Sequence, residues 1–434
     1  MKSLPFTLIS FFLLLTIAGS AQTGIFYSTD EDLSNSLINK IYQDKYDYIW
    51  IATEDGLNKF DGMKFSVYKN NLNDSTSLKN NYVRCMQEDS KGRFWVGGIN
   101  GLQLFNRNTN KFSNVHLYSS NNILQPHVTS VFESKDGTIW ISTSGEGVLK
   151  LNPHKNARFE TDPRLNSKLP SIHLTFIHQD SYDQLWIGTE NHGLCMYDNN
   201  SGAIRLFNVS AGNIDNNHIS AVAEDDKGNI FIGTLSGGIF KLSREKWIFE
   251  SIPYVKSPVP LPIKSLFINN QKQLLIGTDG LGLKYYNYEK NRIEDYQMFS
   301  SIFDFSKVKV HSILEDRSGN LWIGLFQKGV FLVRNNPYQF NYIGNKYHNQ
   351  DLIGSSCVTA IYRDKNYLWV GTDNDGMYRL DGQYRTRHFA HTNAPNSITS
   401  TVMSIVGTKN GEIWLGSYLN GLALFNQSTG GCTY

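Results

Sequence analysis

Residues 185–194 read Leu-Trp-Ile-Gly-Thr-Glu-Asn-His-Gly-Leu, and versions of this stretch recur along the chain. Each version is a short apolar strand, then a glycine, then a second apolar strand. One anchor residue marks each copy, at Trp50, Trp95, Trp140, Trp186, Phe231, Leu275, Trp322, Trp369 and Trp414. The anchors are 44 to 47 residues apart, and seven of the 8 tryptophans are anchors. The chain therefore consists of nine copies of one repeat.

Each copy predicts four short strands. In the third copy we expect them at 127–134, 139–143, 148–151 and around 158–160, with a turn at Asp136-Gly137. No segment shows helical periodicity beyond a turn or two, and four strands per repeat are typical of propeller blades. We therefore predict an all-β fold, a seven-bladed β-propeller followed by the first two blades of a second, incomplete propeller.

The anchors are expected to be structural. A tryptophan in each blade would fill the wedge between neighbouring sheets, and Phe231 and Leu275 keep apolar bulk while losing the indole. The aspartates of the hairpin turns lack the alternating oxygen ligands of a calcium loop, so turn chemistry accounts for them. The sequence predicts no metal site, no cofactor and no catalytic residue.

The blade count sets the predicted domains: a signal peptide at 1–21, a seven-bladed ring at 22–342 and two further blades at 343–434. The repeat pattern changes at Asn335-Asn336-Pro337, after the seventh anchor. Two blades cannot close a ring, and the ninth copy stops soon after its third strand, so we expect a truncated chain. A single ring of eight or nine blades is the alternative. Residues 25–28 are expected to add a strand that closes the first ring.

The first 21 residues have the features of a secretory signal. Lys2 is followed by an apolar stretch from Leu8 to Ile17, and small residues precede Gln22. The stretch is short for a membrane span, which needs about 20 residues. We expect export to the periplasm, with any membrane attachment made through a missing downstream helix.

Composition excludes some partners and leaves the thiols undecided. The 41 Lys and Arg nearly balance the 39 Asp and Glu, and no run of like charge would follow a row of phosphates, so nucleic acid is not an expected partner. The four cysteines (Cys85, Cys195, Cys357 and Cys432) form no metal-binding pattern. Export permits disulfides, but the spacing favours no pairing, and buried free thiols are the default.

The stretch at 185–194, together with Trp-Ile-Ala-Thr-Glu-Asp-Gly-Leu-Asn-Lys-Phe-Asp-Gly at 50–62, resembles the two-component regulator propeller repeat. The resemblance spans the mature chain. It implies the periplasmic sensor region of a hybrid histidine kinase, which binds an oligosaccharide and works as a dimer. In that family two seven-bladed rings precede a membrane helix and a kinase, so this chain would end two blades into the second ring.

Ligand contacts are expected on the loops between the second and third strands, which open on one face of a propeller. These loops vary at a fixed position of the repeat. Glu190, Asn191, His192 and Asp279 carry the carboxylate, amide and imidazole groups that bind sugars, and they are the predicted contacts. His127, His173, His218 and His311 start the first strands of four blades and are interpreted as loop residues that derive from the repeat.

Three functions remain open at this stage. The first is a truncated glycan sensor without catalysis, and the second is a standalone propeller enzyme of the lyase type. The third is a scaffold that binds other proteins, for which we would expect a large apolar patch on one rim.

Overall fold

The computed structural model describes residues 24–434 except 32, 121, 152–157, 255, 257–259, 299–303, 336–342, 345–351 and 383–384. The predicted signal peptide, and residue 342 at the predicted domain boundary, lie outside the described residues. The chain divides into two compact units, Met1–Pro337 and Tyr338–Tyr434. In the described residues helix is limited to α1 (Pro163–Asn166) and the 3-10 turns η1 (Thr29–Glu31) and η2 (Phe305–Lys307), so the chain is all-β as predicted.

The strands of the first unit form seven sheets, each with an innermost, a second, a third and an outermost strand that pair in antiparallel fashion. The innermost strands are β2 (Ile38–Gln43), β6 (Val83–Glu88), β12 (His127–Glu133), β16 (Leu174–Gln179), β20 (Ile219–Glu224), β24 (Ile263–Ile268) and β28 (Val310–Glu315). The second strands are β3 (Ile49–Thr53), β7 (Phe94–Gly98), β13 (Ile139–Ser144), β17 (Gln184–Thr189), β21 (Ile230–Thr234), β25 (Leu274–Thr278) and β29 (Leu321–Leu325).

The third and outermost strands complete each sheet, and each outermost strand except β1 follows the third strand of its sheet along the chain. The third strands are β4 (Gly56–Phe60), β8 (Gly101–Asn106), β14 (Val148–Leu151), β18 (Leu194–Asp198), β22 (Ile239–Ser243), β26 (Leu283–Asn287) and β30 (Gly329–Val333). The outermost strands are β5 (Phe65–Tyr68), β9 (Lys111–Val115), β15 (Phe159–Thr161), β19 (Ile204–Phe207), β23 (Ile248–Ser251), β27 (Arg292–Asp295) and β1 (Gly24–Tyr27). One sheet has two extra strands, β10 (Leu117–Ser119) and β11 (Asn122–Leu124).

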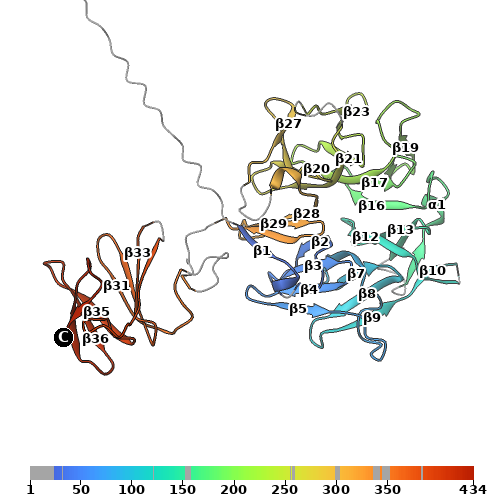
Figure 1. Ribbon diagram of the computed structural model, residues 1–434. Helices are drawn as coiled ribbons and strands as arrows, with labels where there is room; N and C mark the ends of the chain where they lie inside the picture. Colours follow the sequence, from blue (N-terminus) through green and yellow to red (C-terminus); the bar gives the residue numbers. More distant parts are fainter. Residues whose placement is uncertain are drawn as a thin grey trace, which may run out of the picture. The chain divides into compact units, whose positions relative to one another are not determined.

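These sheets form a closed ring (Figure 1). Each innermost strand contacts the innermost strands of the sheets before and after it, and the cycle closes where β28 contacts β2. Strand β1 seals the closure because it pairs with β30, with Gly24 opposite Val333 and Tyr27 opposite Val330. The predicted closing strand at 25–28 is therefore present. We call this assembly the ring.

A glycine and a threonine follow the anchor in most copies of the repeat. The glycine lets neighbouring sheets approach closely. A Cβ atom on Gly233 would lie 2.3 Å from Cγ2 of Ile263 on the next sheet, and one on Gly324 would lie 2.7 Å from Cγ2 of Ile38. Real Cβ atoms do not approach that closely, so a side chain at Gly233 or Gly324 would push the two sheets apart, whereas Ala52 and Ser142 occupy this position in two other copies. The threonine that follows ties its own hairpin, as when Thr189 Oγ1 donates to the carbonyl of Gly193 at 2.7 Å.

The anchor residues fill the space between sheets. All anchors of the ring are buried, from Trp50 and Leu275 at 0% exposure to Trp140 at 7%. The indole of Trp50 also donates to Asp44 Oδ2 at 2.8 Å, and Asp44 Oδ1 accepts the backbone N–H groups of Tyr46 and Tyr48. The turn aspartates therefore hold the indole and the turn at once, which is the structural role expected of them.

A second set of polar contacts links the turn of one sheet to the next sheet. Glu133 accepts hydrogen bonds from the N–H and hydroxyl of Ser90, and Glu224 accepts the same pair from Ser181. At the closure of the ring, the N–H of Arg317 donates to Gln43 Oε1 at 2.9 Å. These contacts fix the angle between neighbouring sheets.

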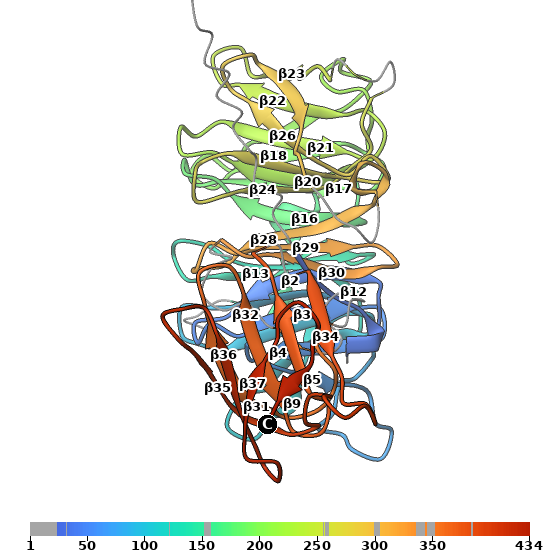
Figure 2. The same ribbon diagram turned by 60° about the vertical axis from the view of Figure 1, so that its left-hand side comes forward.

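The second unit contains two sheets in its described residues. They are β31 (Val358–Arg363), β32 (Leu368–Thr372), β33 (Met377–Leu380) and β34 (Thr386–Phe389), then β35 (Val402–Gly407), β36 (Ile413–Ser417), β37 (Leu422–Phe425) and β38 (Cys432–Thr433). The two sheets lie face to face, as Figure 2 shows for the orange and red strands. Trp369 belongs to the hydrophobic cluster that both sheets form. The anchor of the second of these sheets, Trp414, is half-buried.

Candidate functional site

The innermost strands of the ring line a central channel of about 520 Å³. Pockets that hold small ligands span roughly 300–1,000 Å³. Each innermost strand carries a β-bulge at its start, which leaves one residue unpaired and aims its side chain away from the regular ladder. These bulge residues all line the channel, and they are Asn39, Arg84, Thr129, Thr175, Ser220, Lys264 and His311.

Short bulge residues tie one sheet to the next. Asn39 donates from its side-chain amide to the carbonyl of Val83 at 2.8 Å, and Thr175 Oγ1 donates to Ile219 at 2.6 Å. Ser220 Oγ makes the same bond to Ile263 at 2.7 Å. The default role of a bulge residue is therefore structural, since it closes the inner seam between two sheets.

Arg84 and Lys264 do not make this bond. In their sheets the next residue along the strand contacts the corresponding carbonyl instead. Cys85 Sγ lies 3.9 Å from the carbonyl oxygen of Val128, and Ser265 Oγ lies 3.4 Å from that of Val310. The two long cationic side chains are thereby left to extend into the channel.

Histidines surround the end of the channel where the innermost strands begin, which we call the mouth. The ring of His311 lies against that of Phe326, with centroids 4.7 Å apart. Burial and the charge of Lys264 lower the pKa of His311 to about 4. Burial also lowers the pKa of His127, and the charge of Arg84 adds to this effect. At neutral pH these imidazoles are uncharged and accept or donate one hydrogen bond at each nitrogen.

Two of the predicted contacts, Glu190 and Asp279, lie at the mouth. Glu190 Oε1 accepts a hydrogen bond from Ser144 Oγ at 3.0 Å, and the same hydroxyl lies 3.1 Å from His173 Nδ1. Asp279 Oδ1 is 3.0 Å from the Lys309 ammonium. Burial alone would raise the pKa of Asp279, but its hydrogen bond with Lys309 and the charge of Lys264 hold it below the usual value.

Asn191 and His192 are exposed turn residues between β17 and β18. The backbone N–H of His192 donates to Thr189 Oγ1 at 2.9 Å, which holds the turn, while both side chains are exposed. The ring therefore groups Glu190 and Asp279 with the channel, and it places the other two predicted contacts on the outer surface of the same end.

Sequence reasoning missed Arg84 and Lys264. The sequence analysis interprets His127 and His311 as loop residues, whereas His311 is a bulge residue of the channel and His127 lies at the mouth against Tyr82. A comparison of the copies of the repeat indicates both cations. The bulge residue of the innermost strand is Asn, Thr, Ser or His in five sheets, and a long cation in the other two.

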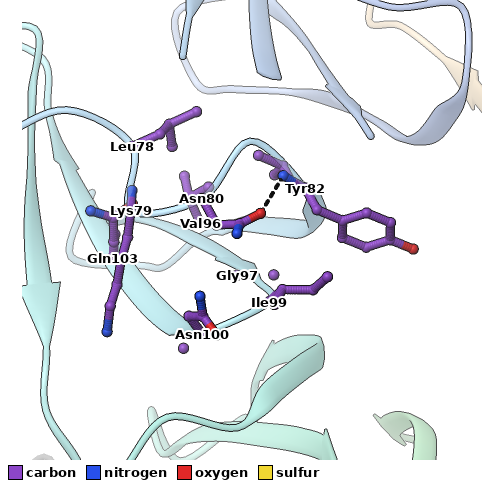
Figure 3. A pocket seen from close by; sticks show the side chains of 12 residues that line it. Leu78, Lys79, Asn80, Tyr82, Val96, Gly97, Ile99, Asn100 and Gln103 are labelled. Atoms are coloured by element: carbon purple, nitrogen blue, oxygen red, sulfur yellow. Dashed lines mark hydrogen bonds between the residues drawn. The ribbon is translucent and has the colours of Figure 1, made fainter. Parts of the chain in front are cut away.

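Tyr82 forms part of the rim beside Arg84. The Asn80 side chain accepts a hydrogen bond from the N–H of Tyr82 at 2.8 Å, and Figure 3 shows the Tyr82 ring extending away from Gln103. The small pocket drawn there has a volume of about 10 Å³, which is the space of a single water molecule. The pocket is therefore too small for a ligand, and the hydrogen bond between Asn80 and Tyr82 holds the turn.

The described residues contain no group of three or more metal-binding side chains, and none of their helices has the length and hydropathy of a membrane span. Three of the cysteines, Cys85, Cys195 and Cys432, are buried free thiols, and Cys357 is exposed.

Comparison with known proteins identifies the repeat. A family model described as the two-component regulator propeller matches residues 32–55, 77–100, 122–145, 213–236, 304–327 and 352–374. Each matched segment ends at or just after the second strand of a sheet. A histidine kinase of Formosa agariphila, named P4, is 44% identical over 71 residues, which are 15% of this chain and 5% of that kinase.

Solved structures show the same fold. The extracellular domain of a hybrid two-component system from B. thetaiotaomicron matches 93% of this chain and 53% of its own length, with a TM-score of 0.63 and 23% identity. A second such domain from that organism has a TM-score of 0.60 and 18% identity over 95% of this chain and 53% of its own length. The chain thus spans about half the length of these domains.

The virginiamycin B lyase of Staphylococcus aureus also matches, with a TM-score of 0.53 and 13% identity over 71% of this chain and 97% of the lyase. At that identity the likeness extends to the fold alone.

Proposed function

We propose, from the two-component regulator propeller repeats that this chain carries, that it is the ligand-sensing extracellular region of a two-component sensor. Its ligand is an oligosaccharide, and the chain binds this ligand without chemical turnover. The chain is exported to the periplasm, and in the complete sensor it works as a homodimer whose arrangement depends on the ligand.

The observation that carries this proposal is the match of six segments to the regulator repeat, in both units of the chain. The likeness in fold to extracellular domains of hybrid two-component systems supports it. A ligand switches such a sensor only if it binds one dimer arrangement more tightly than the other, so a defined binding site is required.

The mouth of the channel supplies the groups that bind sugars. Carboxylates accept hydrogen bonds from the hydroxyl groups of a sugar, and neutral imidazoles and serine hydroxyls both donate and accept them. Glu190 and Asp279 are the proposed contacts inside the mouth. Asn191 and His192 are proposed to contact the part of an oligosaccharide that extends beyond it.

Calorimetric titration of the purified protein with a panel of oligosaccharides tests this function. We expect one class to bind with a defined stoichiometry and to be recovered unchanged afterwards. Glu190→Gln should weaken binding by about tenfold, because a hydrogen bond to a charged group contributes about 1.5–3 kcal/mol. Glu245→Gln, in the exposed turn between β22 and β23, is the matched control.

Two results would contradict the proposal. One is turnover of a bound saccharide, which would favour an enzyme of the lyase type. The other is the absence of binding to every saccharide combined with tight binding of a protein partner, which would favour a scaffold. In the source bacterium, deletion of the gene should also abolish the transcriptional response to one polysaccharide and leave responses to others intact.

A further inference from the structure

Arg84 and Lys264 are long cations at a position where most sheets of the ring have a short residue. In the sheets of Asn39, Thr175 and Ser220 the bulge side chain bonds the next sheet. A structural requirement alone would therefore favour Asn, Thr or Ser at this position. Because Cys85 and Ser265 contact the neighbouring carbonyls instead, the ring can be closed without any contribution from Arg84 or Lys264.

The lining of the channel has more cations than anions, although Glu190 and Asp279 lie at its mouth. Its charged lining residues are the cations Lys40, Arg84 and Lys264 and the single anion Glu54. Within the described residues no ion pair or hydrogen bond joins the Arg84 side chain to a partner. Lys264 lies 3.7 Å from Asp279, but Lys309 lies closer to that carboxylate, at 3.0 Å. Arg84 in particular has no ion-pair partner in the described structure.

The charges of Arg84 and Lys264 influence the same two histidines at the channel, His218 and His311. The charges of both Arg84 and Lys264 lower the pKa of His218 and of His311, in addition to the larger effect of burial. In the described structure Nε2 of His311 and Nε2 of His127 are buried without a hydrogen-bond partner, and Nε2 of His311 lies 3.9 Å from Oδ1 of Asp279. Buried polar atoms are normally paired, so these nitrogens indicate a polar occupant beside the cations.

We propose that Arg84 and Lys264 bind the acidic group, a carboxylate or a sulfate ester, of an acidic oligosaccharide that enters the mouth of the channel. The planar fork of an arginine makes two parallel hydrogen bonds to such a group, and a lysine adds a point charge. The inference rests on the proposed function, because it names the class of saccharide that the same site takes.

The test uses the full chain, with inorganic sulfate and a panel of disaccharides as probes. Each disaccharide that carries one carboxylate or one sulfate ester is paired with its neutral counterpart. The variants are Arg84→Thr and Lys264→Thr, which introduce the residue found at the same position in two other sheets, at Thr129 and Thr175. Lys111→Thr, on the exposed face of the outermost strand β9, removes a cation far from the channel lining and is the control.

We expect at least one acidic disaccharide to bind more tightly than its neutral counterpart, and to bind less tightly as NaCl concentration rises. Each channel variant should weaken this binding by about tenfold to a hundredfold and leave the melting temperature unchanged, whereas Lys111→Thr should change neither. Equal affinity for acidic and neutral members, or full affinity in the Arg84→Thr/Lys264→Thr double variant, would overturn the inference.

The outcomes separate this inference from the proposed function. If neutral disaccharides bind best and the variants have no effect, the anion site is wrong and the sugar sensor stands. If only sulfate binds, and Arg84→Thr abolishes that binding, the anion site stands and the oligosaccharide proposal is wrong. If neither sulfate nor any acidic disaccharide binds, the inference is wrong.

Discussion

The indole Nε1 of Trp186 donates a hydrogen bond of 2.9 Å to Oδ2 of Asp180, six residues earlier in the chain. Oδ1 of the same carboxylate accepts the N–H groups of Tyr182 and Gln184, and Arg244 of the next sheet reaches Oδ2 at 2.9 Å. One buried carboxylate therefore holds an anchor, a hairpin turn and the seam to the neighbouring sheet.

Asp180→Ala should destabilise the ring strongly. The change removes the acceptor of four hydrogen bonds and leaves Arg244 with the more distant carboxylate of Glu224, at 3.9 Å, and breaking a buried ion pair costs about 3–5 kcal/mol. Urea unfolding followed by tryptophan fluorescence measures this loss. Asp226→Ala, at an exposed turn residue, is the control and should cost less than about 0.5 kcal/mol. A similar loss in both variants would mean that the carboxylate has no special role.

Thr175→Val should cost about 1 kcal/mol, because it removes one hydrogen bond between sheets and keeps the shape of the side chain. Arg84→Thr should cost nothing comparable, because Cys85 makes the contact with the next sheet. Thermal unfolding of the two variants measures the difference. Equal destabilisation would show that Arg84 has a structural role that its contacts do not reveal.

The position of the closing strand makes Tyr27 important for stability. Its ring stacks on Trp322 at 6.1 Å and packs against Phe60 and Phe65, so it joins the last sheet to the first. Tyr27→Ala should cost about 2–4 kcal/mol, in the range for truncating a large aromatic in a packed site. Tyr418→Ala, which truncates a tyrosine that is 72% exposed, serves as the control in the same unfolding measurement. A cost below 1 kcal/mol for Tyr27→Ala would show that the ring closes without this contact.

His311 should make the ring sensitive to acid. Its pKa is lowered from 6.5 to about 4 in the folded state, mainly by burial, and its side chain is 18% exposed. Above pH 6.5 the group is neutral in both states and costs nothing. As pH falls from 6.5 to 4 the unfolded chain binds the proton first, so stability falls by up to about 3 kcal/mol.

His311→Asn should remove that part of the pH dependence. The quantity to compare is the change in unfolding free energy between pH 7 and pH 4 in each protein, because groups shared by both cancel. Parallel pH profiles for the two proteins would contradict the assignment of the shift to this histidine.

The repeat, the anchors, the turn aspartates and the closing strand could be predicted from the sequence, because each depends on local pattern. The bulges could not, because a bulge is a property of the pairing between two strands. For the same reason Arg84 reads in the sequence only as a charge within an apolar strand. Its exposure to the channel depends on Cys85 making the contact with Val128, which is a relationship between two sheets.

The predicted ligand contacts remain predictions, and the structure gives only their positions. Loop variation pointed to Glu190 and Asp279, and the structure places both at the mouth, while Asn191 and His192 lie on the surface outside it. Position in a loop does not distinguish Glu190 and Asp279 from Asn191 and His192. The direction of a side chain within a tight turn depends on the hydrogen bonds of that turn, such as the one from the backbone N–H of His192 to Thr189 Oγ1.

The pairing of β1 with β30 has a mechanical consequence. Gly24 lies opposite Val333, so the chain enters and leaves the ring at the same end of one antiparallel pair. Tension applied between these two points would load the hydrogen bonds of the pair one after another, as in a zipper, and would not shear them together. The ring is therefore expected to resist heat and denaturant far better than a pull at its own entrance and exit.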